Sequence, residues 1–120
     1  MRYMMLVKMA PDAGPPPVAL MEAVEAEIKQ QHADGILLDA DGLGPGLEIR
    51  LAAGEVTHID GPFAEAKEVA GGFSLFEVRS HEEAAEIGRR MVRFHEELWP
   101  GQDVAVEMRP LVGPPDPAAE

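Results

Sequence analysis

The chain has no cysteine, one tryptophan and one tyrosine in its 120 residues. Without thiols it has no disulfide framework, thiolate nucleophile, iron–sulfur cluster or cysteine-ligated zinc. Basic residues are also scarce, because ten Lys and Arg stand against 22 Asp and Glu and leave a formal net charge of −12. Since this charge repels phosphate groups, we expect neither nucleic acid nor an anionic membrane surface as a partner.

Long hydrophobic runs are missing as well. The longest apolar run near the N-terminus covers residues 3–7 and is followed at once by Lys8, so it is too short for a secretory or membrane-spanning segment. We therefore expect a cytoplasmic protein. The 46% hydrophobic content is typical of a globular domain. We expect one domain over residues 1–110 and a disordered, proline-rich tail over residues 111–120.

Alternating and apolar runs predict six strands, at residues 2–9, 36–38, 47–51, 56–60, 73–78 and 104–109. The third and fourth form a β-hairpin with one polar face, which turns at Ala53-Gly54. The glycine-rich residues 39–46 are expected to interrupt regular structure, and residues 64–70 to hold a turn or two of helix.

Two helices are predicted from spacing and capping signals. The first begins at Pro17 and ends at Gly35, and its inward and outward faces follow from the three- and four-residue spacing of apolar side chains. The inward residues are Val18, Met21, Val24 and Ile28, and the outward ones are Glu22, Glu25, Glu27 and Lys29. The second follows a capping box of Ser80 and Glu83, carries His95 on its apolar side, and stops at residues 99–101.

The order strand, helix, strand, hairpin, strand, helix, strand is a split βαβ plan with an inserted hairpin. It places both helices on one face of a mainly antiparallel sheet. The first and fifth strands carry apolar side chains on both faces, among them Met4 and Phe73. Because a monomer would expose the uncovered face, we expect a homodimer that packs sheet on sheet.

The corner at residues 60–68 is the main candidate site. Asp60, Gly61 and Pro62 have the chemistry of a structural turn, and Phe63 would anchor it. Alternatively, the corner presents acidic and basic groups to a cleft that binds a small polar molecule, with acid and base groups for lyase- or hydratase-like chemistry. In this hypothesis His58, Asp60 and Lys67 are catalytic, and Phe63, Glu65 and Glu68 bind the substrate.

His58 and Asp60 are two residues apart on one strand and so share a face, which suits an imidazole oriented by a carboxylate. The alternative is a solvated histidine on the polar face of the hairpin. As a weak Zn or Mn site the pair would need further ligands from Glu65, Asp39, Asp41 or a second subunit. Two ligands do not make a site, and we expect neither a metal nor an organic cofactor. His95 and His32 are interpreted as packing or dipole-stabilising histidines, and His81 as exposed.

The stretch Asp60-Gly-Pro-Phe-Ala-Glu-Ala-Lys-Glu, followed by Gly71-Gly-Phe and an apolar strand, resembles the DGPF branch of the YCII-related family. The resemblance runs from residue 2 to Pro110. It implies a ferredoxin-like α+β subunit that pairs into a dimeric α+β barrel. Family members usually have Thr where this chain has Ala66.

The resemblance leaves the activity open. The YCII branch is thought to use a His near the start of the first helix and an Asp-Pro after the second, and residues 15–23 and 97–103 contain neither. That dyad therefore cannot be transferred to this chain. DGPF relatives resemble partners or fused segments of extracytoplasmic-function sigma factors, which implies the alternative of a non-catalytic interaction or regulatory module.

Overall fold

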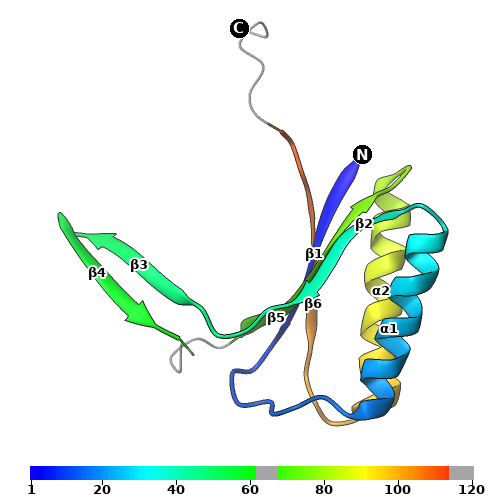
Figure 1. The fold of residues 1–120 in the computed structure, drawn as a ribbon, viewed down its shortest axis with the longest axis horizontal. Coiled ribbons are helices and arrows are strands. Elements are labelled where there is room, and N and C mark those ends of the chain that lie inside the picture. The colour runs from blue at the N-terminus through cyan, green and yellow to red at the C-terminus, as the bar shows by residue number, and fades with distance from the viewer. Residues whose placement is uncertain (62–67, 114–120) are drawn as a thin grey trace, which may run out of the picture.

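The computed structural model describes residues 1–61 and 68–113. It confirms the predicted α+β class, with two helices and antiparallel strands (Figure 1). In chain order the elements are β1 (Arg2–Met9), α1 (Val18–Ala33), β2 (Leu37–Gly42), β3 (Leu47–Ala52), β4 (Glu55–Asp60), β5 (Val69–Glu77), α2 (His81–Leu98) and β6 (Ala105–Pro110).

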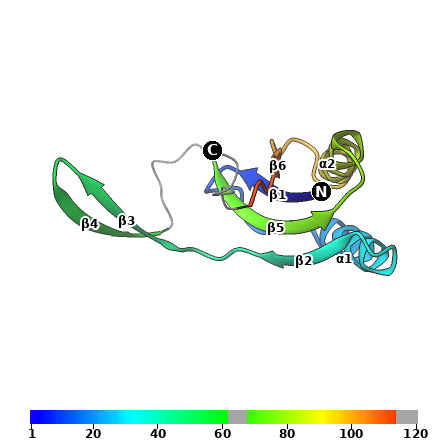
Figure 2. The same ribbon diagram turned by 90° about the horizontal axis from the view of Figure 1, so that it is seen from above.

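Four strands form one sheet in the order β2-β5-β1-β6, and every neighbouring pair is antiparallel. Strands β1 and β2 therefore run parallel with β5 between them, and β5 and β6 run parallel with β1 between them. These are two interlocked split βαβ units, as in ferredoxin-like folds. Both helices lie on the same side of the sheet (Figure 2).

The core lies between this sheet and α2. Alternate residues of β1 point toward the helices, so Tyr3 and Met5 are buried while Met4 is only half-buried. Phe76, on β5 opposite Tyr3, has no exposed surface. The remaining buried members of the cluster are Val78, Ala84, Ile87 and Met91.

Helix α2 begins as predicted, but its capping box is only half formed. The Ser80 Oγ accepts a hydrogen bond of 3.1 Å from the Glu83 amide. The Glu83 carboxylate, however, does not bond the Ser80 amide and accepts instead from Arg79, from Nε at 2.8 Å and from the backbone amide at 3.4 Å. This hydrogen bond from Arg79 lowers the pKa of Glu83 below its ordinary value of 4.5. The basic side chain next to the cap therefore competes successfully for the carboxylate.

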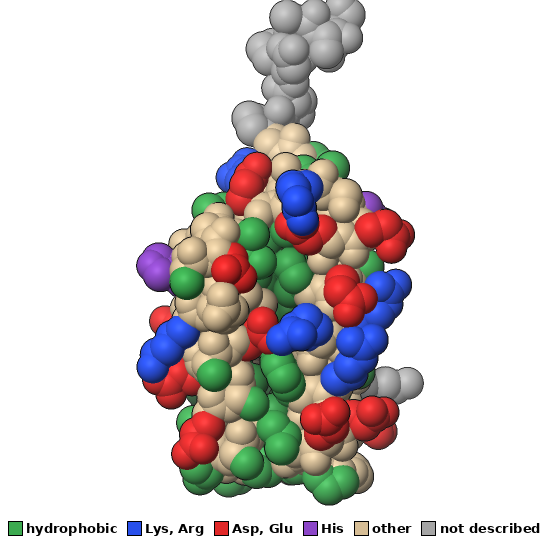
Figure 3. All heavy atoms as spheres, turned by 90° about the vertical axis from the view of Figure 1, so that its right-hand side faces the viewer, with side chains coloured by type: hydrophobic (Ala, Val, Ile, Leu, Met, Phe, Trp, Pro, Cys, Tyr) green, Lys and Arg blue, Asp and Glu red, His purple; other side chains and the backbone are tan. Residues whose placement is uncertain are grey.

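The predicted faces of α1 are partly wrong. Val18 and Met21 are exposed, whereas Glu27, expected to face water, is buried. Its Oε2 accepts from Arg90 Nε at 3.0 Å and Nη2 at 2.6 Å, which joins α1 to α2 and compensates the buried charge. Figure 3 shows charged side chains over both helices with a band of hydrophobic side chains between them.

Strand β2 extends further than predicted. The structure continues it to Gly42, where the backbone pairs with Gly72 of β5, instead of ending it at Leu38. Glycine-rich residues were expected to stop the strand, but a neighbouring strand supplies hydrogen-bond partners that outweigh their weak strand preference. Likewise Val69 and Ala70, expected to be helical, belong to β5. Residues 64–67 of that predicted helix lie outside the described residues.

Strands β3 and β4 form the predicted hairpin, here called the arm (residues 47–60). They pair with each other in a sheet separate from the main one. The turn at Ala53 and Gly54 has positive φ at both residues, 51° and 79°, as in the type I′ turns that match strand twist. The arm projects from the side of the sheet opposite the helices (Figures 1 and 2).

The side of the sheet turned away from the helices is here called the open face. Its centre carries four half-buried apolar side chains, and directly opposed residues of β1 and β5 form two pairs there. These pairs are Met4 with Leu75 and Leu6 with Phe73. In the described part of the chain no element lies on this face (Figure 2).

The C-terminal end of the described chain continues the sheet slightly. The Leu111 amide donates to the Arg2 carbonyl at 2.9 Å, one residue beyond β6. Residues 114–120, which hold most of the predicted tail, lie outside the described residues. Of the described helices, neither combines the length and apolar character needed to cross a membrane.

Candidate functional sites

The arm brings two predicted catalytic residues together. His58 Nε2 lies 2.8 Å from Asp60 Oδ1, and both side chains are more than half exposed. A carboxylate oxygen only accepts hydrogen bonds, so Nε2 must carry a proton, and in the neutral form of the ring the lone pair is on Nδ1. The pair thus has the geometry of an imidazole oriented by a carboxylate.

The register of the arm places this pair on the apolar face of the hairpin. His58 is opposite Ile49, and Asp60 is opposite Leu47. Since directly opposed residues of antiparallel strands share a face, the pair lies beside these two apolar side chains. His58 is therefore not on the polar face of the hairpin, although its side chain is exposed, as the alternative of a solvated histidine requires. The polar face carries Glu48, Arg50 and Thr57 instead.

The corner itself is described only at its two ends. Phe63, Glu65 and Lys67 lie outside the described residues, and Glu68 is exposed just before β5. At the other end the Gly61 amide donates to the Gly46 carbonyl at 2.7 Å. A Cβ at position 61 would lie 2.7 Å from the same oxygen, so this close approach requires glycine. Gly61 thus has a structural function, through a contact with Gly46 that was not predicted from the sequence.

No described residues form a cluster of three or more metal-ligating side chains. Asp39 and Asp41, considered as added ligands for His58, lie on β2, and each accepts from the amide of the next residue at 2.9 and 2.8 Å. The described part of the chain therefore offers His58 and Asp60 no third ligand.

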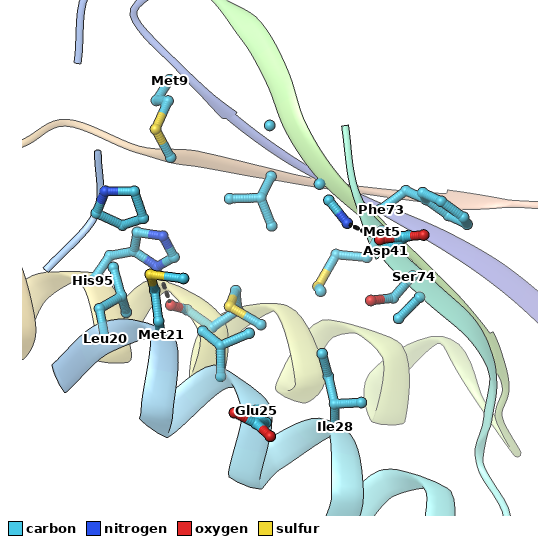
Figure 4. A pocket seen from close by; sticks show the side chains of 18 residues that line it. Met5, Met9, Leu20, Met21, Glu25, Ile28, Asp41, Phe73, Ser74 and His95 are labelled. Atoms are coloured by element: carbon cyan, nitrogen blue, oxygen red, sulfur yellow. Dashed lines mark hydrogen bonds between the residues drawn. The ribbon is translucent and has the colours of Figure 1, made fainter. Parts of the chain in front are cut away.

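A second feature, not predicted from the sequence, is a cavity of about 490 Å³ between α1 and the helix-facing side of the sheet (Figure 4). This volume lies in the range of small-molecule sites. Most of the lining is apolar, and four of the lining side chains are methionines. The labelled lining residues are Met5, Met9, Leu20, Met21, Glu25, Ile28, Asp41, Phe73, Ser74 and His95.

Two polar side chains that line this cavity are almost fully buried. His95 and Ser74 each expose 5% of their surface. His95 is on the apolar side of α2, as predicted, and its Nδ1 lies 2.8 Å from the Met91 carbonyl oxygen. The apolar spacing of α2 pointed to His95 as a packed residue, whereas nothing in the sequence pointed to Ser74, because cavities form only where distant elements meet.

The other two histidines stand apart from both sites. His81 is exposed, as predicted, and its Nδ1 lies 2.6 Å from the buried hydroxyl of Tyr3. This contact ties the first turn of α2 to β1 and was not predicted. His32 is exposed in the last turn of α1.

The architecture defines the class: an α+β subunit of the ferredoxin-like type, with a hairpin inserted between its two βαβ units. Within that class, the model of the YCII-related domain matches residues 1–99, and the chain belongs to this family. The match ends just after α2 and thus includes both sites. The comparison with curated proteins gives no match.

Proposed function

We propose that the protein acts as a homodimer that binds a small polar molecule beside the corner at Asp60, with His58 as its proton-transfer group. The observation that carries the proposal is the 2.8 Å contact between His58 and Asp60 on the apolar face of the arm. The carboxylate fixes the ring and leaves Nδ1 to accept a proton from a bound molecule. Asp60 and Lys67 complete the acid and base groups, and Phe63, Glu65 and Glu68 contact the ligand.

The exposed apolar surface of the arm supports the dimer. Ile49 is 66% exposed and Leu51 72%, and Leu47 and Val56 on the same face are also exposed. A two-stranded hairpin is marginally stable in water unless another surface covers its apolar face. Because the described part of the chain covers neither this face nor the open face, each copy has two apolar surfaces in need of a partner.

A second copy fits both surfaces at once. The arm and the open face lie on the same side of the molecule (Figure 2). In a two-fold dimer each subunit supplies one arm and one open face, so a single symmetric contact covers all four surfaces. The cover would also remove water from around His58 and strengthen its interaction with Asp60.

The dimer is tested by placing a charge on either face of the arm. Ile49→Asp puts a carboxylate on the apolar face, and Thr57→Asp puts one on the polar face as the matched control. We expect light scattering to give a particle of twice 13.0 kDa for the wild type and Thr57→Asp, and 13.0 kDa for Ile49→Asp. A monomeric wild type, or a dimer that survives Ile49→Asp, would contradict the assembly.

The role of His58 is tested separately, on the dimer. A panel of small hydroxy acids, keto acids and amides is screened by thermal melting against the wild type, His58→Ala, and His32→Ala as a control on an exposed helical histidine. We expect at least one compound to raise the melting temperature of the wild type and His32→Ala but not of His58→Ala. If His58→Ala leaves every ligand-induced shift unchanged, the site is wrong, and the non-catalytic interaction module is favoured.

A further inference from the structure

We propose that the cavity between α1 and the sheet is a second binding site, for a neutral aromatic molecule that carries a hydroxyl group, and that His95 accepts its hydrogen bond. This proposal is independent of the one made for His58, because the cavity lies on the helix side of the sheet and the arm projects from the opposite side. It rests on the cavity and on the buried polar atoms within it.

The hydrogen bond of His95 determines which nitrogen is available. A carbonyl oxygen only accepts, so Nδ1 at 2.8 Å from the Met91 oxygen must carry a proton. In the neutral ring Nε2 is therefore an acceptor, and it has no hydrogen-bond partner among the described residues. Figure 4 shows the ring of His95 within the cavity. The site thus presents a lone pair to a ligand that brings its own hydrogen.

The burial pattern indicates that this acceptor keeps a small accessible surface at the lining of the cavity. Among the described residues, no side-chain nitrogen or oxygen atom is both inaccessible and unpartnered. His95 Nε2 and Ser74 Oγ have no protein partner there, although each residue is only 5% exposed. Their small accessible surface therefore opens into the cavity, where they lie on opposite sides (Figure 4).

The rest of the lining selects the ligand class. The charged residues of the lining are Glu25 and Asp41, both acidic, and no lysine or arginine belongs to it. Glu25 is exposed and pairs with Lys29 at 3.4 Å, and Asp41 is opposite Phe73 and so shares its face of the sheet, the open face. The interior of the cavity therefore offers no lysine or arginine side chain to an anion, so a carboxylate or phosphate ligand would lose its hydration without compensation and fits poorly. Four methionines, including Met5 and Met91, supply flexible sulfur contacts that favour aromatic rings. A phenol-type hydroxyl on an apolar ring meets all three conditions: it donates a hydrogen bond to His95, it carries no charge, and its ring contacts the methionines.

The test compares three probes of one shape: 2-naphthol, naphthalene and 2-naphthoate. Binding to the full-length wild type is measured by fluorescence titration. We expect 2-naphthol to bind once per chain and about tenfold tighter than naphthalene, because only the hydroxyl pairs with the buried acceptor. We expect 2-naphthoate to bind most weakly. Equal binding of 2-naphthol and naphthalene, tighter binding of 2-naphthoate, or no binding of 2-naphthol at about 1 mM would overturn the proposal.

Variants of the cavity residues show where the hydroxyl group of 2-naphthol binds. His95→Gln should remove the preference for 2-naphthol over naphthalene, while His32→Gln, the exposed control, keeps it. Ala40→Leu should fill the cavity and weaken both probes, because Ala40 belongs to its lining. A preference lost in Ser74→Ala but kept in His95→Gln would overturn the assignment to His95.

A measurement on the wild type keeps the test valid if His95→Gln does not fold. The ¹⁵N resonance of His95 Nε2 should shift when 2-naphthol is added and stay in place when naphthalene is added. An Nε2 resonance that is the same with both probes would show that the hydroxyl is not bound there.

Discussion

The body of the molecule and its arm are built from equally apolar strands but differ in what covers them. In the body, β1 and β5 bury Tyr3, Met5 and Phe76 against α2. In the arm, every residue of β4 is exposed, although Val56 and Ile59 are as hydrophobic as those core residues. Hydrophobic alternation therefore predicts a strand equally well in both regions, but it does not predict whether the same chain buries the strand.

The difference separates two sources of stability. Burial in the body is local to one subunit and contributes about 25 cal/mol for each Å² of apolar surface removed from water. In the proposed dimer the arm would gain this contribution only on association, so its share would depend on protein concentration. Substitutions in the two regions should accordingly differ in size and in their response to dilution.

The largest expected effect is that of Phe76→Ala. Phe76 has no exposed surface, so its truncation leaves a cavity and should destabilise the protein by about 3–5 kcal/mol at every protein concentration. Leu51→Ala, at a residue 72% exposed in the subunit, is the matched change in the arm. If the proposed dimer forms, urea unfolding should show an effect of Leu51→Ala that vanishes when dilution dissociates it. If both variants lose similar free energies of unfolding in the dissociated subunit, the body and the arm do not differ in their source of stability.

The predictions from sequence succeed where the pattern of residues within a single segment determines whether it forms a strand or a helix. Apolar and alternating runs, together with capping residues such as Ser80, placed all six strands, both helices and the hairpin turn. The bounds of β2 and β5 and the inward face of α1 were less accurate, because neighbouring elements decide them. The burial of Glu27 could not follow from such patterns, since its partner Arg90 is 63 residues away in the chain. The cavity beside His95 likewise depends on how α1 sits over the sheet.

The face of the arm on which His58 lies is a different case, because the sequence contains enough information to predict it. A two-residue turn at Ala53-Gly54 pairs Ala52 with Glu55 and therefore Ile49 with His58. Once the turn is placed, counting outward assigns both residues to one face. Treating the two strands as separate alternating patterns missed this register.

An intermediate effect is expected where the body holds a buried charge. The Glu27 side chain is 8% exposed, and its contact raises the pKa of the Arg90 guanidinium. Glu27→Gln should cost about 1–2 kcal/mol in urea unfolding, less than for a fully buried pair because Arg90 is half-exposed. Glu25→Gln removes a surface pair with Lys29 and should cost at most about 0.5 kcal/mol. An equal cost for the two variants would mean that the contact between the helices adds no stability.

The smallest expected effect tests whether the arm folds as a separate element. Ala53 has φ 51°, a conformation that is unfavourable for alanine and easier for asparagine in a type I′ turn. Ala53→Asn should stabilise the arm by about 0.5 kcal/mol and slow amide hydrogen exchange in β4 without changing exchange in β5. Ala52→Asn, at a paired strand position next to the turn, should accelerate exchange in the arm instead. If Ala53→Asn slows exchange in β5 as much as in β4, the arm and the body unfold together, and the arm's stability would come from the body of its own subunit.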